Sequence, residues 1–162
     1  MNIKPRLIVL CGLPGSGKST DTSMMRDSDW FVYSTDDYLE TVSAGEGTDY
    51  DTVFDEYIKV ANTYMNKHVQ YAIRDRQNVL WDQTNLTLRK RAAILSRFPL
   101  YYHKECWYYP VTERDYAQWR ARLASRSGKT LPEHVLQSMI AGMNVPTKSE
   151  GFDQFLIKRT FS

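Results

Sequence analysis

The segment that most constrains how this chain can fold is a glycine-rich stretch at residues 12–20, which reads Gly-Leu-Pro-Gly-Ser-Gly-Lys-Ser-Thr. It satisfies the Walker A pattern G-x-x-x-x-G-K-S, in which glycines let backbone N–H groups wrap a phosphate at the positive end of a helix. A short apolar run at residues 6–11 precedes it and is typical of a strand buried on both faces. We therefore expect a strand, a phosphate-binding loop and a helix beginning near Gly17, in that order.

The side chains of this loop indicate a nucleoside triphosphate with Mg²⁺. Lys18 would neutralise the β and γ phosphates, and the Ser19 hydroxyl would ligate magnesium. The residues assigned to nucleotide binding are Gly12, Pro14, Gly15, Ser16, Gly17, Lys18, Ser19 and Thr20. The loop alone does not distinguish a kinase from a GTPase or an ATPase motor, but the sequence lacks the Asn-Lys-x-Asp segment with which GTPases read guanine.

Beyond the loop, the apolar pattern alternates between strand and helix. Further strands are expected at residues 30–34, 78–81, 103–109 and, as an edge strand, 155–157. Helices are expected at residues 51–75, 86–97, 112–124 and 132–142, the third beginning with a capping box at Thr112 and Asp115. This alternation predicts an α/β fold with a parallel sheet covered by helices on both faces. The length suits one domain, so we expect a single domain over residues 1–162.

Composition narrows the class of protein. The chain is 42% hydrophobic and 25% charged, which is typical of a packed globular protein and excludes a disordered or collagen-like chain. Its longest early apolar run, residues 7–11, is too short for a signal peptide or a membrane span, so we expect a cytoplasmic protein that binds no membrane. The two cysteines, Cys11 and Cys106, lie far apart, which indicates reduced thiols and no zinc site.

The net charge of +2 conceals an uneven distribution. Residues 27–56 carry ten acidic residues and no Lys or Arg, whereas residues 84–129 carry ten basic residues against three acidic ones. Such runs are commonly solvated faces. Here the acidic run contains one candidate catalytic segment and the basic run ends in another, so we interpret both as parts of a functional site.

The candidate segment in the acidic run is Ser-Thr-Asp-Asp-Tyr at residues 34–38, after the second expected strand. Loops that follow neighbouring parallel strands converge on one crevice, so Asp36 is expected to reach the γ-phosphate side of the Walker A loop. A carboxylate there can accept the proton of an attacking hydroxyl, as a kinase requires. The two aspartates could instead cap a helix or form a solvated turn.

A third candidate segment, Asp-Gln-Thr-Asn at residues 82–85, follows the third expected strand. Asp82 closes an apolar run in the manner of a Walker B acid and could order the shell of magnesium. Thr84 and Asn85 could serve the site, or they could cap the helix expected from Leu86.

The basic run ends in Arg120, Arg122, Arg126 and Lys129, with Gly128 between the last two. Arg122 and Arg126 are four residues apart and would share a helix face. Because phosphoryl transfer depends mainly on positioning and charge stabilisation, an arginine closing on the triphosphate contributes roughly 10³-fold or more. Gly128 would supply a flexible point for a closing lid. A solvated basic helix end is the alternative interpretation.

Taken in order, these residues resemble the kinase domain of phage and mammalian polynucleotide 5′-kinases. The similarity covers the Walker A loop, residues 36–38, the turn at residues 82–86, the two lid arginines, and residues 131–139 and 146–152. It implies a phosphate-kinase sheet with the strand order 2-3-1-4-5. It also implies ATP-dependent phosphorylation of a nucleic-acid hydroxyl, with DNA favoured over RNA.

The resemblance further implies a set of roles for the candidate residues. Lys18, Asp36 and Arg126 would be catalytic, with Asp36 as the general base; Ser19 and Asp36 would hold Mg²⁺. Arg122 and Arg126 would contact ATP from the lid. The residues assigned to the acceptor are Asp37, Asp82, Thr84, Asn85 and Arg89.

Two departures from the family keep other acceptors open. The phage enzyme has an arginine directly after Asp-Asp-Tyr that contacts the acceptor's phosphate, whereas this chain has Leu39, and we expect no attached phosphatase domain of the kind that the family has. One alternative is a phage DNA-modification kinase of similar fold, which phosphorylates the hydroxymethyl group of 5-hydroxymethyluracil after the base leaves the stack. A small-molecule kinase acting on a nucleoside or metabolite, and a nucleotide-dependent switch that is no kinase, are further alternatives.

A polynucleotide acceptor would need phosphate and stacking contacts. The candidates are the basic cluster Arg89-Lys90-Arg91 and the aromatic residues Tyr101, Tyr102, Trp107, Tyr108 and Tyr109. Aromatic residues on or beside a strand more commonly belong to the core, so none of them is assigned to DNA individually. The oligomeric state is not indicated by any pattern in the sequence.

Overall fold

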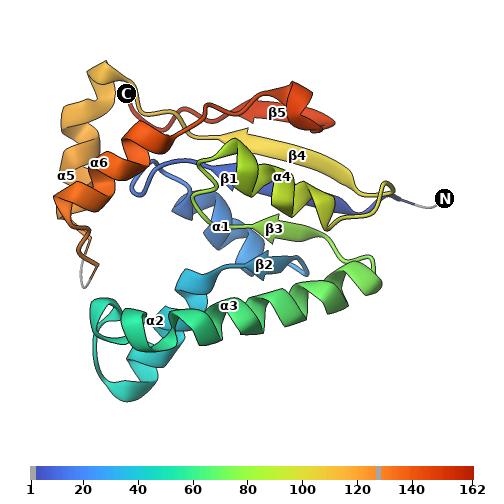
Figure 1. Ribbon diagram of the computed structural model, residues 1–162, viewed down its shortest axis with the longest axis horizontal. Helices are drawn as coiled ribbons and strands as arrows, with labels where there is room; N and C mark the ends of the chain where they lie inside the picture. Colours follow the sequence, from blue (N-terminus) through green and yellow to red (C-terminus); the bar gives the residue numbers. More distant parts are fainter. Residues whose placement is uncertain (1–2, 127–128) are drawn as a thin grey trace.

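A computed structural model describes residues 3–126 and 129–162. Within these residues, one parallel sheet runs in the order β2-β3-β1-β4-β5 (Figure 1). Its strands are β1 (Arg6–Cys11), β2 (Phe31–Tyr33), β3 (Val79–Trp81), β4 (His103–Tyr108) and β5 (Gln154–Ile157). The strand order that the resemblance implied is confirmed, and so is the α/β fold of P-loop kinase type.

The central strand β1 pairs in parallel with β3 on one side and with β4 on the other. From Leu7 to Cys11 its side chains are fully buried, which explains why the run is apolar without alternation. Leu7, Val9 and Cys11 face one layer of the core, whereas Ile8 and Leu10 face the other, as the two-residue period of a strand requires.

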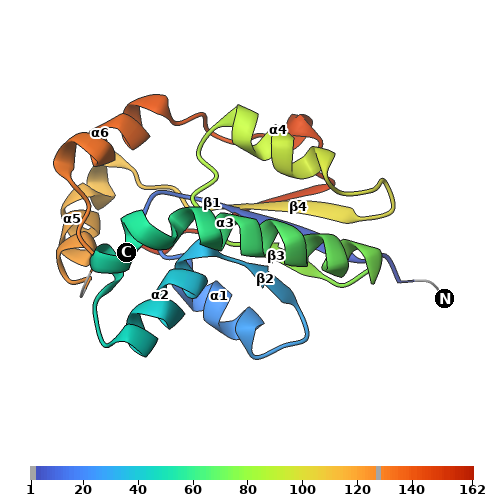
Figure 2. The ribbon, with the colours of Figure 1, turned by 60° about the horizontal axis from the view of Figure 1, so that its bottom comes forward.

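Helices cover both faces of this sheet, as expected. The helices are α1 (Ser19–Arg26), α2 (Thr35–Glu46), α3 (Tyr50–Arg74), α4 (Leu88–Ser96), α5 (Tyr116–Ala124) and α6 (Glu133–Gly142), with short 3₁₀ turns η1 (Glu113–Asp115) and η2 (Lys148–Glu150). Side chains of α3 and α4 pack on the Leu7 side of the sheet, and α1 packs on the Ile8 side. Figure 2 shows α4 and α1 on opposite sides of the sheet.

Helix α2 was not among the helices expected from the apolar pattern. Residues 35–46 form a helix whose N-cap Ser34 accepts a hydrogen bond from the Asp37 N–H at 3.1 Å, so the two aspartates lie in its first turn and not in a solvated turn. Its few apolar residues, chiefly Leu39, pack against Val53 and Ala61 of α3 rather than against the sheet. Because this helix covers another helix, its apolar stripe is too narrow for the periodicity of its own sequence to indicate it.

The start of α4 also differs from the prediction. The helix begins at Leu88, and its N-cap is Thr87, whose side chain accepts a hydrogen bond from the Lys90 N–H. The interpretation of Thr84 and Asn85 as caps is therefore wrong, because both precede the cap position. By contrast, the capping box at Thr112 and Asp115 is confirmed, although the first turn that it opens is the 3₁₀ turn η1 before α5.

Both cysteines are buried and free, as expected. Burial raises the pKa of the Cys11 thiol to about 11, so this thiol stays protonated and unreactive at neutral pH. Over residues 3–126 and 129–162, no helix combines the length and the apolarity that a membrane crossing demands. Gly128, expected as a pivot, lies outside the described residues.

Candidate active site

The glycine-rich loop connects β1 to α1, as the sequence predicts, and two of its glycines have left-handed backbones. Gly15 has φ 76° and Gly17 has φ 108°, and residues with a Cβ rarely adopt such positive φ values. At Gly17 a Cβ would also lie 2.6 Å from Thr160 Cβ, because residues 158–162, the C-terminal segment, pack directly on the loop. Gly17 is therefore required both by the loop's conformation and by the close approach of residue 160.

Lys18 folds back over this loop. Its Nζ donates hydrogen bonds to the carbonyl oxygens of Gly12 at 2.5 Å and Leu13 at 3.0 Å. Burial lowers the pKa of Lys18 to about 8, and the nearby Asp82 carboxylate opposes that shift. The ammonium is still mainly charged at pH 7, and it lies where the loop would present it to a phosphate.

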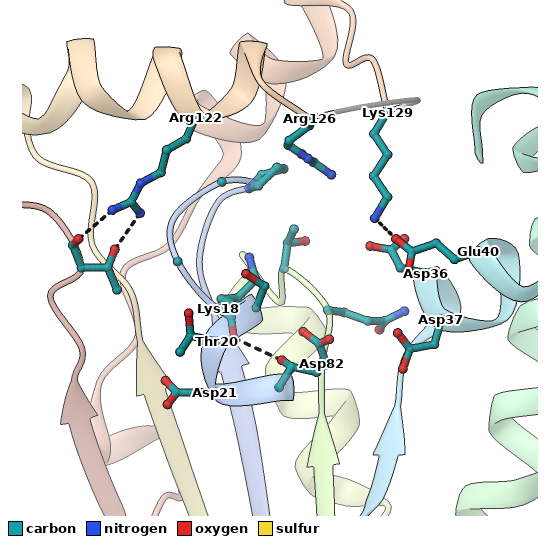
Figure 3. A pocket seen from close by; sticks show the side chains of 18 of the residues that line it. Lys18, Thr20, Asp21, Asp36, Asp37, Glu40, Asp82, Arg122, Arg126 and Lys129 are labelled. Atoms are coloured by element: carbon teal, nitrogen blue, oxygen red, sulfur yellow. Dashed lines mark hydrogen bonds and ion pairs between the residues drawn. The ribbon is translucent and has the colours of Figure 1, made fainter. Parts of the chain in front are cut away.

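The loop forms the floor of a cavity of about 820 Å³, seen in Figure 3. The walls come from α1, α2, the β3–α4 turn, the end of α5 and the C-terminal segment. Twelve of the sixteen predicted site residues line it: Pro14, Gly15, Gly17, Lys18, Ser19, Thr20, Asp36, Asp37, Asp82, Thr84, Arg122 and Arg126. The other four, Gly12, Ser16, Asn85 and Arg89, do not line it. The fold thus brings together, at the carboxyl ends of the strands, candidates that are up to about 110 positions apart in the sequence.

Three carboxylates face Lys18 across this cavity (Figure 3). Asp36 and Asp37 lie in the first turn of α2, and Asp82 directly follows β3. Burial raises the pKa of Asp82 to about 6; Lys18 lowers it, while Asp37 and Asp36 raise it further. Asp37 is held by Arg26, whose Nε donates to it at 3.0 Å and whose Nη2 binds its other oxygen.

Tyr50, a residue that the sequence analysis did not single out, contacts the proposed base directly. Its hydroxyl donates a hydrogen bond to Asp36 Oδ1 at 2.5 Å. Burial, together with the Asp36 charge, raises the pKa of Tyr50 well above its ordinary value, so the hydroxyl remains a donor at neutral pH. The two residues meet only because α3 doubles back on α2, and α2 was not expected.

The two lid arginines differ in their surroundings. Arg122 and Arg126 were expected to share a helix face. This expectation is wrong, because helix α5 ends at Ala124 and Arg126 follows it. Arg126 points into the cavity (Figure 3). Arg122 donates hydrogen bonds to Thr160 Oγ1 at 3.0 Å and to the Thr160 carbonyl at 2.7 Å, and its guanidinium lies 3.9 Å from the centre of the Phe161 ring.

The C-terminal segment also belongs to the site, although nothing in the sequence indicated that it reaches the phosphate loop. The Thr160 hydroxyl donates to the Ser16 carbonyl of the loop at 2.5 Å. Lys158 lies 3.5 Å from Asp21 of α1. Figure 1 shows the C-terminus beside α5. No motif in residues 154–162 signals these contacts, since they depend on β5 delivering the segment to the loop.

A second cavity, of about 580 Å³, adjoins the first and shares Asp36, Asp82, Gln83 and Thr84 with it. Its other walls come from α2, α3, α6 and the β3–α4 turn. They offer mostly apolar surface, from Phe54, Ile58, Leu86, Val135 and Met139, although the polar residues Thr35, Asn85, Thr87 and Ser138 also line the cavity. Among the described residues that line it, Lys90 supplies the positive charge, and burial lowers the pKa of this lysine. Asp36 therefore lies between a polar cavity and an apolar one.

The basic cluster at residues 89–91 is not one surface, so this expectation is corrected. Arg91 is fully buried and pairs with Glu150, with Nε–Oε1 and Nη2–Oε2 distances of 2.8 and 3.0 Å. Arg89 is exposed on α4 and lines neither cavity, while Lys90 reaches the second one. Three neighbours on one helix point in different directions because each residue turns by about 100°.

Asn85 and several aromatic residues serve the core. Asn85 is buried in a left-handed conformation, φ 48°, and its Nδ2 donates to the Leu10 carbonyl at 2.7 Å, so its side chain points toward β1 although its position borders the second cavity. Tyr102, Trp107 and Tyr109 are buried in the core clusters on the two faces of the sheet. The ordinary interpretation of these three aromatics, as core residues, holds.

The residues present fit a Mg²⁺ ion that is bound mainly through phosphates. Ser19 is the first residue of α1, and its hydroxyl lines the same cavity as the Asp36 and Asp82 carboxylates. Mg²⁺ prefers such oxygen ligands and commonly takes one or two of them together with substrate phosphates. In the part of the chain that the structure describes, no three His, Cys, Asp or Glu side chains are grouped so that they could hold an ion by themselves.

A comparison with protein families matches residues 7–146 to a family described as "AAA domain". These residues run from β1 to the segment after α6. The match therefore includes every residue that lines the two cavities except Thr160.

Solved structures of similar fold include different kinds of kinase. A Chloroflexus aurantiacus protein described as a candidate kinase has a TM-score of 0.68 at 12% identity, over 98% of this chain and 87% of that one. A chain of the Pnkp1/Rnl/Hen1 RNA repair complex has a TM-score of 0.63 at 19% identity, over 88% of this chain and 45% of that one. A gluconokinase from Sinorhizobium meliloti has a TM-score of 0.56 at 17% identity, over 98% and 84%. At these identities the likeness concerns the fold.

Proposed function

This chain belongs to that AAA-domain family, and from the geometry of its site we propose that it is an ATP-dependent nucleic-acid kinase, which transfers the γ-phosphate of ATP to a hydroxyl of DNA or RNA. Its P-loop kinase-type fold supports a phosphotransferase. The fold does not indicate the acceptor, which we infer from the site. DNA is the first acceptor to test.

The observation that carries this proposal is the position of Asp36 between two cavities. On one side lie the phosphate loop, Lys18 and Arg126, which suit a triphosphate. On the other side lies the apolar cavity, which can hold the body of an acceptor. A kinase needs this arrangement, because the attacking hydroxyl and the γ-phosphorus must meet in line beside a group that takes the proton.

The chemistry of the second cavity favours a nucleotide unit over a polyhydroxylated sugar. Its walls offer mainly alkyl and aromatic surface from Phe54, Ile58 and Met139, on which a flat base can pack. Polar residues of the same cavity, such as Thr35, Thr87 and Ser138, could pair with hydroxyls of a sugar acid, but the apolar surface would then lack the partner that a flat base supplies. Lys90 can neutralise one neighbouring phosphate, a role that Leu39 cannot fill because it is buried between α2 and α3.

The proposed reaction uses the residues as follows. The acceptor hydroxyl gives its proton to the Asp36 carboxylate while its oxygen forms a bond to the γ-phosphorus, and the bond from that phosphorus to the β–γ bridging oxygen breaks to release ADP. Lys18 and Arg126 stabilise negative charge on the transferring group. Ser19, with Asp36 or Asp82, would hold Mg²⁺, which supplies charge neutralisation on the phosphates when bound. Arg122 tethers the C-terminal segment beside the loop.

The experiment is transfer of labelled γ-phosphate from ATP to a panel of acceptors: 5′-hydroxyl oligonucleotides of DNA and RNA, 5′-blocked oligonucleotides, duplexes containing 5-hydroxymethyluracil, nucleosides and gluconate. We expect label on 5′-hydroxyl DNA and a loss of about 10²- to 10⁴-fold in Asp36→Asn, with ATP binding retained. Label on blocked, modified duplex alone would favour the DNA-modification kinase.

A small-molecule kinase is the second candidate, because the second cavity is small and Lys90 is its single described cation. Label on nucleosides or gluconate, with none on any oligonucleotide, would replace the nucleic-acid proposal by this one. Slow ATP hydrolysis with no labelled acceptor in the panel would instead favour a nucleotide-dependent switch.

A further inference from the structure

We propose that Tyr50 is a positioning residue for Asp36, and that residues 129–130, which follow the arginine-bearing lid, hold Tyr50 in place. The inference rests on the proposed function, because it assigns Tyr50 a purpose only if Asp36 acts on the acceptor hydroxyl. Tyr50 lines neither cavity, so it need not touch the acceptor or ATP.

Asp36 needs a partner from another helix to fix its orientation. Its side chain is exposed in the first turn of α2, so nothing in its own helix fixes the plane of the carboxylate. The Tyr50 hydroxyl binds Oδ1 at 2.5 Å, which is a short, charge-assisted hydrogen bond. With one oxygen engaged, the carboxylate has a defined orientation, and its other oxygen can accept the acceptor's proton.

Residues 129–130 hold Tyr50 in place. The Lys129 ammonium lies 5.0 Å from the centre of the Tyr50 ring and pairs with Glu40 of α2. In the next residue, the Thr130 N–H and hydroxyl donate to Asp51 Oδ2 at 2.8 and 2.6 Å. Residues 129–130 therefore contact α2 and α3 around Tyr50, and Figure 3 shows Lys129 reaching from the lid side toward Asp36.

These contacts join the two functional halves of the site. Arg126 faces the nucleotide cavity, and three residues later Lys129 stands over the residue that orients the base. The segment docked in this way holds Tyr50, and through Tyr50 it holds Asp36 in one orientation.

The chain offers a closely matched control for Tyr50. Tyr57 lies two turns later in the same helix, and its hydroxyl donates to Glu46 Oε1 of α2 at 2.8 Å. The pair thus links the same two helices by the same kind of hydrogen bond, but Tyr57 lines neither cavity and touches no candidate catalytic group. Tyr57→Phe measures the structural worth of such a bond without disturbing the base.

The test compares Tyr50→Phe with Tyr57→Phe in the full chain, using label transfer to whichever acceptor the panel identifies. We expect Tyr50→Phe to lower kcat roughly 10- to 100-fold while the KM for ATP stays within about twofold. Tyr57→Phe should retain wild-type kcat, and both variants should unfold at similar temperatures. Asp51→Asn, which weakens the Thr130 contact, should lower kcat less than Tyr50→Phe does.

A double-mutant cycle separates this inference from the proposed function. If Tyr50 acts through Asp36, then adding Tyr50→Phe to Asp36→Asn produces no further loss. Full loss in Asp36→Asn with wild-type kcat in Tyr50→Phe overturns the Tyr50 inference alone. Equal losses in Tyr50→Phe and Tyr57→Phe also overturn it, since the bond would then matter only for helix packing. Wild-type transfer in Asp36→Asn overturns the proposed base itself.

Discussion

The two sides of the site are built in different ways. The nucleotide side centres on one continuous segment, residues 12–20 with α1, to which Arg126 and the C-terminal segment add a few contacts. The acceptor side consists of α2, the first turns of α3, the β3–α4 turn and α6, and each contributes only a few side chains. Most of the triphosphate site can therefore be encoded locally, whereas choosing an acceptor requires separate elements to pack correctly.

The two sides also differ in electrostatics. Lys18 and Arg126 face the phosphate region, while Asp36 and Asp82 lie where the first cavity meets the apolar one. The uneven charge distribution in the sequence is thus reproduced across a single crevice. Substitutions on the nucleotide side should abolish reaction with every acceptor, whereas those on the acceptor side should alter acceptor affinity or preference.

The largest effect is expected at Lys18. Lys18→Met removes the ammonium that faces the phosphates, so transfer to every acceptor should fall by roughly 10³-fold. Lys59→Met, on the exposed surface of α3, is the matched control and should leave transfer unchanged. Initial rates of label transfer measure both. A loss confined to one acceptor would contradict the division between the two sides.

Gly17 tests how strongly the loop depends on the C-terminal segment. Gly17→Ala places a Cβ 2.6 Å from Thr160 Cβ at φ 108°, so the segment must move, and ATP affinity should fall roughly 10- to 100-fold. Gly45→Ala is the control, because a Cβ in that helix meets nothing within 4 Å and should be neutral or stabilising. Calorimetric titration with ATP distinguishes them. Unchanged affinity in Gly17→Ala would show that the contact with residue 160 is dispensable.

Asp82 lines both cavities, and its raised pKa should make the free energy of unfolding depend on pH. Its pKa is about 6 in the folded protein against a model-peptide value of 3.8, so the folded state binds its proton more tightly, and stability falls as pH rises from about 4 to 6. Asp82→Asn should therefore stabilise the metal-free protein at pH 7–8 by on the order of 1–3 kcal/mol and have little effect near pH 3. Thermal unfolding in EDTA measures this. A stabilisation of equal size at both pH values would contradict the assignment.

The smallest effect is expected at Lys90. Lys90→Met should raise the KM for a polynucleotide acceptor about 10-fold at low salt and reduce the salt dependence of acceptor affinity by about one phosphate contact, with the KM for ATP unchanged. Arg89→Met is the control, since Arg89 lies beside it on α4 but lines neither cavity. Equal changes in both variants would indicate a general surface attraction instead of a contact in the cavity.

Much of the fold and of the nucleotide side could be predicted from the sequence. The strands, most helices and the loop with Lys18 and Ser19 are local patterns, since each depends on residues within about 20 positions. The prediction failed where one element covers another: α2 was missed because Leu39 packs on α3, and residues 89–91 were taken as one basic surface although Arg91 is buried against Glu150.

By itself, the sequence determined that this chain forms an α/β fold with a phosphate-binding loop, because apolar period, glycine positions and loop chemistry act over short distances. Only the tertiary structure decided what surrounds that loop. The hydrogen bond from Tyr50 to Asp36, the contact of Thr160 with the loop and the apolar cavity beside Asp36 each join residues that are distant in the chain. Their positions follow from which faces of the helices and sheet are buried together, and packing of that kind leaves no local pattern in the sequence.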